Sequence, residues 1–129
     1  MLDNKTILIT GATGSFGKAL IKFLLKKCKL KKIVVFSRDE VKQFEMQQSK
    51  QFDSKVMRYL IGDVRDFDRL NLATDGIDFV VHAAALKQVP TAEYNPFEVV
   101  KTNVITVIIT ALKNEGMIWK FLLKCCNVK

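Results

Sequence analysis

Three glycines near the start of the chain have the spacing of a loop that binds phosphate. Gly11, Gly14 and Gly17 form the pattern G-x-x-G-x-x-G between the apolar residues 7–9 and a helix-like stretch. In such a loop the first glycine permits a tight turn, the second lets the backbone approach a pyrophosphate, and the third allows close helix packing. The amide groups and positive dipole end of the following helix attract an anion. The pattern therefore predicts a dinucleotide site, and the alternative is an ordinary glycine-rich turn.

Residues that could select between NAD and NADP follow the second expected strand. Ser37 and Arg38 come directly before Asp39. An acidic residue at this place usually accepts a hydrogen bond from the ribose 2′-hydroxyl of NAD, whereas a nearby arginine accommodates the 2′-phosphate of NADP. Because a guanidinium group matches the geometry of phosphate, the sequence favours NADP over NAD. The alternatives are that Arg38 is a surface residue and that Asp39 caps the next helix; the cap does not exclude a ligand role.

Other candidate ligand residues follow the third and fourth expected strands. The carboxylate of Asp63 could accept a hydrogen bond from an adenine amino group, with Val64 against the ring; the alternative is an aspartate that starts a turn. Ala83 is small enough for the backbone to pass close to the nicotinamide ribose. Lys87 could reach a ribose hydroxyl or a substrate phosphate, and Thr102 could touch the cofactor.

The histidine and cysteines of the sequence show no pattern of a metal or redox site. The single histidine, His82, lies in an apolar strand and is interpreted as a packed residue. The cysteines, Cys28, Cys125 and Cys126, are odd in number and match no metal or redox spacing, which indicates reduced thiols. We therefore predict no metal site.

Strand-like and helix-like segments alternate along the chain. This pattern predicts an α/β fold, a Rossmann-like doubly wound parallel sheet with strand order 3-2-1-4, and leaves a fifth strand open. On the first helix we expect Ala19, Leu20, Phe23 and Leu24 to face the sheet. The expected strands are 6–10, 32–37, 56–61 and 77–82, the last buried on both faces, and the expected helices are 16–27, 39–52, 66–73 and 96–113.

Composition narrows the classes of partner. The chain has 129 residues, enough for one domain, and no apolar run long enough to span a membrane. Its start lacks a secretory pattern, so we expect a cytoplasmic location. The net charge of +8 could serve an anionic partner, but the lysines are dispersed and no aromatic residues are interleaved with them. We therefore expect no nucleic-acid partner and no membrane association.

Four motifs together resemble the extended short-chain dehydrogenase/reductase superfamily. They are TGATGSFGKAL, FSRDE, GDVRD and HAAALKQVPTAEYNPFEVVKTNV. Within the superfamily they closely resemble the inverting UDP-N-acetylglucosamine 4,6-dehydratases of bacterial pseudaminic acid and polysaccharide biosynthesis. The resemblance extends over residues 2–115, and SRDE with ALKQVP and EYNP is its most specific part. It implies a dinucleotide-binding domain over residues 1–115, NADP as cofactor and UDP-N-acetylglucosamine as substrate, and it leaves a homo-oligomer open.

The resemblance also implies particular roles. The family's nicotinamide takes a hydride from sugar C4 and returns it to C6 after water is lost across C5 and C6. Lys87 would border the sugar nucleotide as well as the cofactor. The residues implied or expected at the cofactor are Gly11, Thr13, Gly14, Ser15, Phe16, Gly17, Ser37, Arg38, Asp39, Glu40, Val41, Lys42, Asp63, Val64, Ala83, Lys87 and Thr102.

The catalytic pair of the superfamily, Tyr-x-x-x-Lys, is not found. Tyr59 and Tyr94 are followed four residues later by Asp63 and Glu98, and residues 116–129 form a divergent apolar tail in place of the family's Ser-Thr-Asp-Lys strand. The sequence therefore predicts the amino-terminal half of such an enzyme, truncated by a shift of reading frame, with no catalytic residue, no substrate domain and no activity alone. The alternative is a dinucleotide-binding module with no chemistry of its own.

Overall fold

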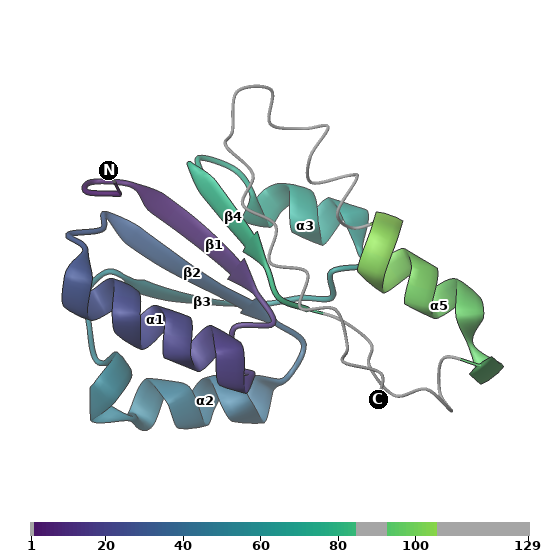
Figure 1. The fold of residues 1–129 in the computed structure, drawn as a ribbon, viewed down its shortest axis with the longest axis horizontal. Helices are drawn as coiled ribbons and strands as arrows, with labels where there is room; N and C mark the ends of the chain where they lie inside the picture. The colour runs from purple at the N-terminus through teal and green to yellow at the C-terminus, as the bar shows by residue number, and fades with distance from the viewer. Residues whose placement is uncertain (1, 85–92, 106–129) are drawn as a thin grey trace, which may run out of the picture.

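The computed structural model describes residues 2–84 and 93–105, and a parallel sheet forms their centre (Figure 1). The strand order is β3-β2-β1-β4, which confirms the predicted order 3-2-1-4. All three strand pairs are parallel, with Leu8 of the central strand aligned with Val34 on one side and Val80 on the other. The strands are β1 (Thr6–Thr10), β2 (Lys32–Ser37), β3 (Met57–Ile61) and β4 (Phe79–His82).

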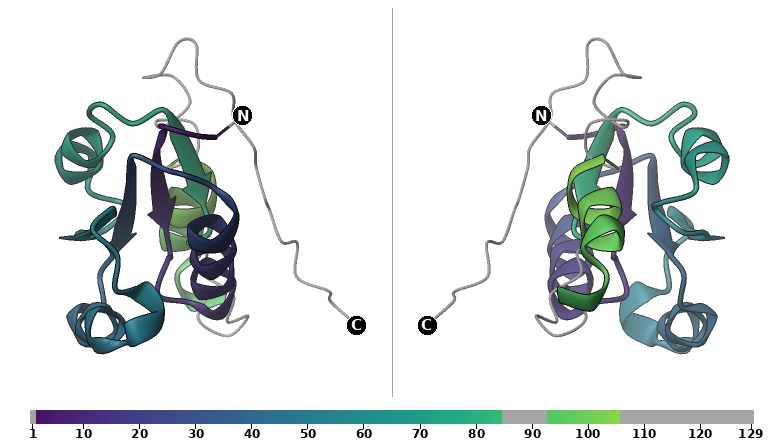
Figure 2. Two further views of the ribbon diagram at one scale, coloured as in Figure 1. Left: turned by 90° about the vertical axis from the view of Figure 1, so that its left-hand side faces the viewer. Right: turned by 90° about the vertical axis from the view of Figure 1, so that its right-hand side faces the viewer.

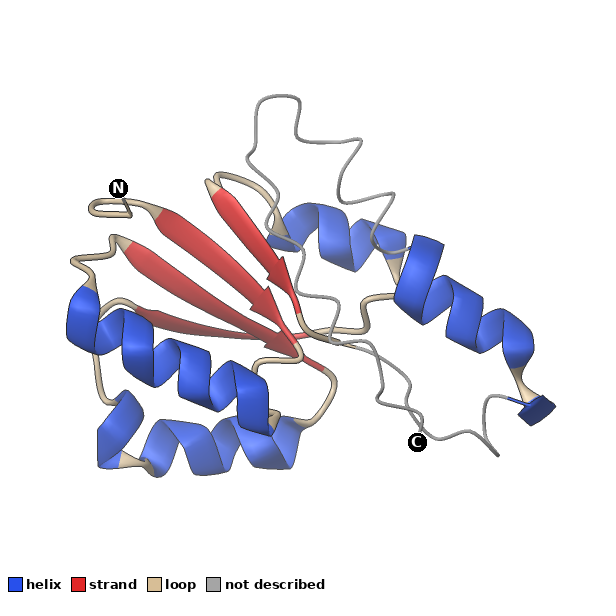
Figure 3. Ribbon diagram, viewed as in Figure 1, coloured by secondary structure: helices blue, strands red, loops and turns tan. Residues whose placement is uncertain are grey.

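Helices alternate with the strands along the chain, as Figure 3 shows. Asp39 and Asp66 act as helix caps, because their carboxylates accept from the backbone N–H groups of Lys42 at 2.9 Å and Arg69 at 3.0 Å. Within the two described stretches no helix has the length and apolarity to cross a membrane. The helices are α1 (Ser15–Lys27), α2 (Glu40–Gln48), the 3₁₀ turn η1 (Lys50–Phe52), α3 (Phe67–Ala73), α5 (Pro96–Val100) and the π-helical turn η2 (Lys101–Ile105).

Two apolar clusters cover the two faces of the sheet. Ile7 and Ile9 of β1 pack with residues of α1, α2 and η1, whereas Leu8 packs with residues of α3. Successive side chains of a strand point to opposite faces, so the middle of a strand between two helical layers is apolar on both faces. Figure 2 shows α1 and α3 on opposite sides of the sheet.

The prediction of which residues of α1 face the sheet is partly wrong. Leu24 is buried, but Ala19 and Phe23 are exposed, and Phe23 is 58% exposed. The buried positions are Gly17, Ile21 and Leu24, which follow the i, i+4, i+7 spacing of one helix face. Gly17 sets this rotation, because a Cβ there would lie 2.5 Å from the Cα of Ala12. The buried face of the helix therefore contains Gly17 and not Phe23.

The fourth strand is less buried than its sequence predicts. Only Val80 is buried, while Phe79, Val81 and His82 are half-buried. Among the described residues β4 pairs with β1 alone and forms one edge of the sheet. An apolar strand at an edge keeps part of its side chains accessible to solvent. The fifth strand that the sequence leaves open and the tail 116–129 lie outside the described residues.

Candidate functional site

A cleft of about 410 Å³ lies where the carboxyl ends of the four strands meet. Each strand contributes to its wall through the loop that follows it, as expected for a parallel sheet with a switch in strand order. Most residues predicted for the cofactor line this one cleft, although their role in binding stays a prediction. They are Gly11, Thr13, Gly14, Ser37, Arg38, Asp39, Lys42, Asp63, Val64, Ala83 and Thr102, accompanied by Phe36, Gly62 and Ala84.

The turn after β1 is held against the end of β4. Gly11 has φ +63, the left-handed region that glycine adopts readily. A Cβ at Gly11 would lie 2.7 Å from the backbone nitrogen of Ala84 and 2.8 Å from the carbonyl carbon of Ala83. The predicted tight turn is present, and the glycine is also needed because another backbone passes beside it. Sequence spacing gives no sign of this second reason.

The amino end of α1 opens onto the cleft through Gly14. Gly14 occupies the N-cap position, where it makes no side-chain hydrogen bond to the helix. The first N–H groups of a helix lack intrahelical partners, so an uncapped amino end can donate them to an anion. Ser15, Phe16 and Gly17 form the first turn behind this position and do not line the cleft.

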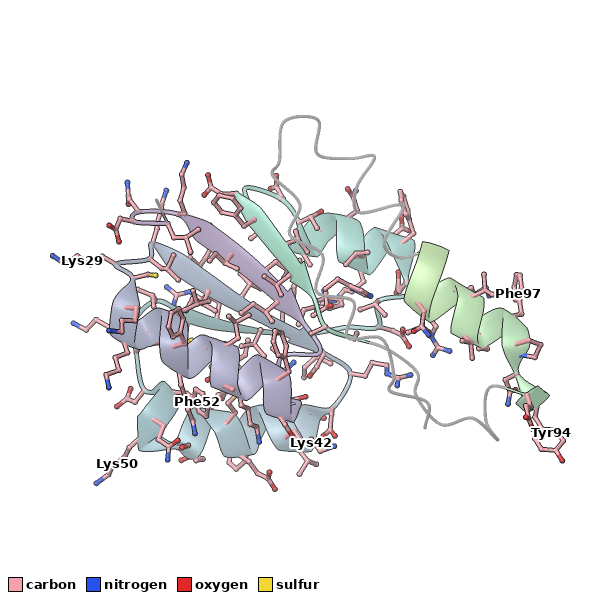
Figure 4. The ribbon with its side chains drawn as sticks, in the orientation of Figure 1. Lys29, Lys42, Lys50, Phe52, Tyr94 and Phe97 are labelled. Atoms are coloured by element: carbon pink, nitrogen blue, oxygen red, sulfur yellow. The ribbon has the colours of Figure 1, made fainter. Side chains whose placement is uncertain are left out.

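One corner of the cleft, here called the basic corner, contains two cationic side chains and a hydroxyl group. The cations belong to Arg38 and Lys42, and the hydroxyl group belongs to Ser37. The ammonium group of Lys42 lies 2.8 Å from Asp39 Oδ2, and this contact lowers the pKa of Asp39. The other oxygen of Asp39 caps α2. This carboxylate is therefore engaged with residues of its own helix. Figure 4 shows Lys42 at the start of α2.

The two residues between Asp39 and Lys42 that were also predicted for the cofactor lie off the cleft wall. Glu40 and Val41 form the first turn of α2 and are exposed, Val41 at 67%. Their predicted role is therefore not supported by a position on the cleft. Lys87 lies outside the described residues, so the structure does not place it.

An ion-pair cluster that sequence reasoning missed holds Asp63 in the cleft wall. The Arg65 guanidinium group donates from Nε to Asp63 Oδ1 at 2.9 Å and from a terminal nitrogen to Oδ2 at 2.6 Å, and it also pairs with Glu98 of α5. Arg38 lies 3.5 Å from the same Oδ2. The hydrogen bonds from Arg65 are the main cause that lowers the pKa of Asp63, so the group is ionised at neutral pH. Arg65 thereby joins the end of β3 to α5.

His82, which was predicted to be a packed residue, is half-buried and lies beside Thr10 of β1. Thr10 Oγ1 accepts from the backbone N–H groups of Ala83 at 3.2 Å and Ala84 at 3.4 Å. Its own hydroxyl hydrogen can then be donated to His82 Nδ1, which lies 2.8 Å away. The side chain pair thus fixes the loop that leaves β4 beside the loop that leaves β1. Burial lowers the pKa of His82, although the nearby backbone of Thr102 and Ala84 acts in the opposite direction.

Lowering the pH from 7 to 5 is expected to destabilise the protein through His82. Because burial lowers the folded-state pKa of His82, the unfolded chain takes up a proton below its ordinary value of about 6.5 while the folded chain does not. The free energy of unfolding, measured with urea, should therefore fall as the pH decreases through this window. The chain has one histidine, so no other imidazole contributes. His82→Asn keeps an acceptor for Thr10 but does not titrate, and an unchanged pH dependence in that variant would contradict the assignment.

Neither described tyrosine lies on the cleft wall. Tyr59 lines a separate hollow beside η1, and burial raises the pKa of its hydroxyl group. Tyr94 is 84% exposed and projects from the segment before α5 (Figure 4). The structure therefore brings no tyrosine of the described residues to the position of a general base.

The cleft has properties that suit a dinucleotide. It combines an uncapped helix terminus for a diphosphate, the basic corner for a further phosphate, and an ionised Asp63 beside the apolar Val64. A side chain at Gly11 would push the β1 and β4 loops apart, so the close approach of these two backbones depends on that residue. The cleft volume falls within the usual range for small-molecule sites.

A parallel sheet of order 3-2-1-4, with a glycine-rich turn after its first strand and a cleft at the strand ends, defines the first half of a Rossmann-like doubly wound domain. Residues 7–119 match a family model described as polysaccharide biosynthesis protein. The match covers more than half of the chain, and the chain belongs to this family.

Similar proteins with curated names include two kinds of enzyme. The UDP-N-acetylglucosamine 4,6-dehydratase (inverting) of Campylobacter jejuni strain 81-176 is 60% identical over 104 residues, which is 81% of this chain and 30% of that protein. The UDP-glucose 4-epimerase of Rickettsia massiliae is 44% identical over 121 residues, covering 89% of this chain and 35% of that protein. This chain thus spans about a third of the length of these relatives. The X-ray structure of Pen from Bacillus thuringiensis has a TM-score of 0.77 at 42% identity, over 84% of this chain and 33% of that one.

Proposed function

We propose that this chain is the NADP-binding part of an inverting UDP-N-acetylglucosamine 4,6-dehydratase. The identity of 60% to the Campylobacter dehydratase supports this choice over a UDP-glucose 4-epimerase, for which the identity is 44%. Because the chain covers only 30% of that dehydratase, binding of the sugar nucleotide and its dehydration are proposed for a longer protein that contains this part. A role in pseudaminic acid synthesis and a cytoplasmic location, where nucleotide sugars are made, belong to the same proposal.

The observation that carries the cofactor proposal is the basic corner beside the uncapped end of α1. The diphosphate would lie against the turn that contains Gly14, where backbone N–H groups are available. The 2′-phosphate would lie at Arg38 and Lys42, while the adenine would lie between Val64 and the carboxylate of Asp63. The Asp39 carboxylate already contacts the Lys42 ammonium group and accepts from the backbone N–H group of Lys42. It would therefore be less available to accept a hydrogen bond from the ribose 2′-hydroxyl of NAD.

Bound NADP would supply a reversible hydride acceptor at the sugar. The residues of this chain would bind and orient it, and Ala83 and Thr102 are among those that line the cleft. A general base for the sugar hydroxyl is not found among the 129 residues as a Tyr-x-x-x-Lys pair. We therefore propose that the chain alone binds NADP without turning over the sugar nucleotide.

The absence of a Tyr-x-x-x-Lys pair from the 129 residues also favours a second candidate function. This candidate is a dinucleotide-binding module without chemistry of its own. Under this alternative, residues 1–115 bind the dinucleotide and take no part in a reaction. The homo-oligomeric state that the resemblance left open can belong to either candidate. The two candidates agree on binding of NADP and differ in whether a larger protein with this part acts on UDP-N-acetylglucosamine.

Calorimetric titration of the purified chain with NADP and with NAD tests the shared proposal. We expect saturable binding with tighter affinity for NADP. A folded chain that ignores both dinucleotides at millimolar concentration would overturn it. Incubation of the same sample with UDP-N-acetylglucosamine tests the absence of turnover, since formation of a 4-keto product would show that a base outside the Tyr-x-x-x-Lys pattern is present.

Extending the chain separates the two candidates. If the downstream DNA, read in the other two frames, encodes Ser-Thr-Asp-Lys and Tyr-x-x-x-Lys, the joined protein should dehydrate UDP-N-acetylglucosamine. If neither motif is encoded there, truncation of a dehydratase is wrong and the binding module is favoured.

A further inference from the structure

Gln43 is a buried polar side chain that the sequence does not mark as functional. It lies on α2, is 2% exposed, and its Nε2 is 3.1 Å from the carbonyl oxygen of Leu60 and 3.2 Å from that of Ser37. Carbonyl oxygens can only accept, so the end of the amide that faces them must be the NH₂ group, which can only donate. The same nitrogen lies 3.0 Å from Ser37 Oγ. The amide thus joins α2 to the ends of β2 and β3.

This contact limits the direction in which the Ser37 hydroxyl group can donate. The NH₂ group of Gln43 offers no lone pair, so the hydroxyl hydrogen of Ser37 turns away from it. Ser37 is 9% exposed and lines the cleft beside Arg38 and Lys42. The side of the hydroxyl group that remains accessible is therefore the basic corner. A hydroxyl group that accepts on one side and donates on the other is also polarised toward the second partner.

From this geometry we infer that Gln43 is a positioning residue that makes the Ser37 hydroxyl a hydrogen-bond donor toward a phosphate group in the basic corner. The inference rests on the proposed function, because the phosphate concerned is the 2′-phosphate of NADP. A phosphate oxygen only accepts, whereas a ribose hydroxyl can donate as well. A hydroxyl group held as a donor therefore favours the phosphorylated ligand, and Gln43 contributes to cofactor preference without touching the cofactor.

Two nucleotides that differ by the 2′-phosphate alone provide the test. Adenosine 2′,5′-bisphosphate and adenosine 5′-monophosphate are titrated into the full 129-residue chain, and the ratio of their Kd values measures the preference. Gln43→Met keeps the side-chain length but removes the amide, Ser37→Ala removes the hydroxyl, and the double variant combines them. Gln48→Met makes the same chemical change at an exposed position of α2 and is the matched control.

We expect Gln43→Met and Ser37→Ala each to lower the preference for the bisphosphate by about ten- to thirtyfold, as for one hydrogen bond to a charged group. The double variant should lose no more than either single variant, and Gln48→Met should keep the full preference. The ratio does not depend on the fraction of folded protein, because both ligands are measured on the same sample.

Three outcomes would contradict the inference. Equal weakening of both nucleotides by Gln43→Met would show a purely structural role. An unchanged preference in Ser37→Ala would show that the hydroxyl group donates nothing to the phosphate, and this variant decides the question if Gln43→Met does not fold. Failure of the unchanged chain to bind either nucleotide would instead overturn the proposed function and the inference with it.

Discussion

Replacing Gly11 by alanine is expected to destabilise the protein by about 2–4 kcal/mol and to weaken NADP binding more than tenfold. Gly11 has φ +63, where a side chain is strained, and its Cβ would lie 2.7–2.8 Å from backbone atoms of Ala83 and Ala84. Backbone atoms cannot move aside as the end of a flexible side chain can. The β1 and β4 loops would therefore separate and open the cleft that they form.

Gly76 provides a matched control for this prediction. It has φ +64, but a Cβ there meets no atom within 4 Å. Gly76→Ala should therefore show the backbone strain alone, about 1 kcal/mol, and leave NADP binding unchanged. The comparison is made by urea unfolding and calorimetry on both variants. If Gly11→Ala and Gly76→Ala behave alike in both measurements, the close approach of the two loops does not matter for the site.

The sheet could be predicted from the sequence because each strand is marked by residues that are close together in the chain. Residues 6–10 and 32–37 are short runs between turn signals, and the middle of each run is apolar, as expected for a strand between two helical layers. The order 3-2-1-4 then follows from right-handed crossovers. The rotation of α1 could not be predicted in the same way, because Phe23 and Ile21 are both apolar. The choice between them is made by the contact of Gly17 with Ala12, which periodicity does not show.

The residues of the candidate site also fall into those that the sequence predicts and those that it does not. Residues at strand ends, such as Ser37 and Asp63, were predictable because parallel strands bring their carboxyl ends together. Gln43 and Arg65 were not, since each acts through partners that only the fold brings near, across β2 and β3 for Gln43 and from β3 to α5 for Arg65. Neither has a spacing that distinguishes it from an ordinary exposed side chain.

Replacing Arg38 by methionine is expected to weaken NADP binding by about thirtyfold and to change NAD binding by less than threefold. The Arg38 side chain is 60% exposed and belongs to the cleft wall, where its guanidinium group can form two hydrogen bonds to a phosphate. Hydrogen bonds to charged groups contribute about 2 kcal/mol, which corresponds to this loss of affinity. Asp63 loses a cation at 3.5 Å but keeps its hydrogen bonds to Arg65, so the rest of the cleft wall should be unchanged.

Arg58→Met separates this effect from a loss of overall positive charge. Arg58 is exposed on β3, where it donates to the backbone carbonyls of Lys55 and Met57 and does not line the cleft. Both variants lower the net charge of +8 by one unit, so general attraction of anions falls equally. Arg38→Lys keeps the charge but not the fork of the guanidinium group and should lie between the unchanged chain and Arg38→Met. Equal losses for NADP and NAD in Arg38→Met would place the 2′-phosphate elsewhere and remove the main structural reason for preferring NADP.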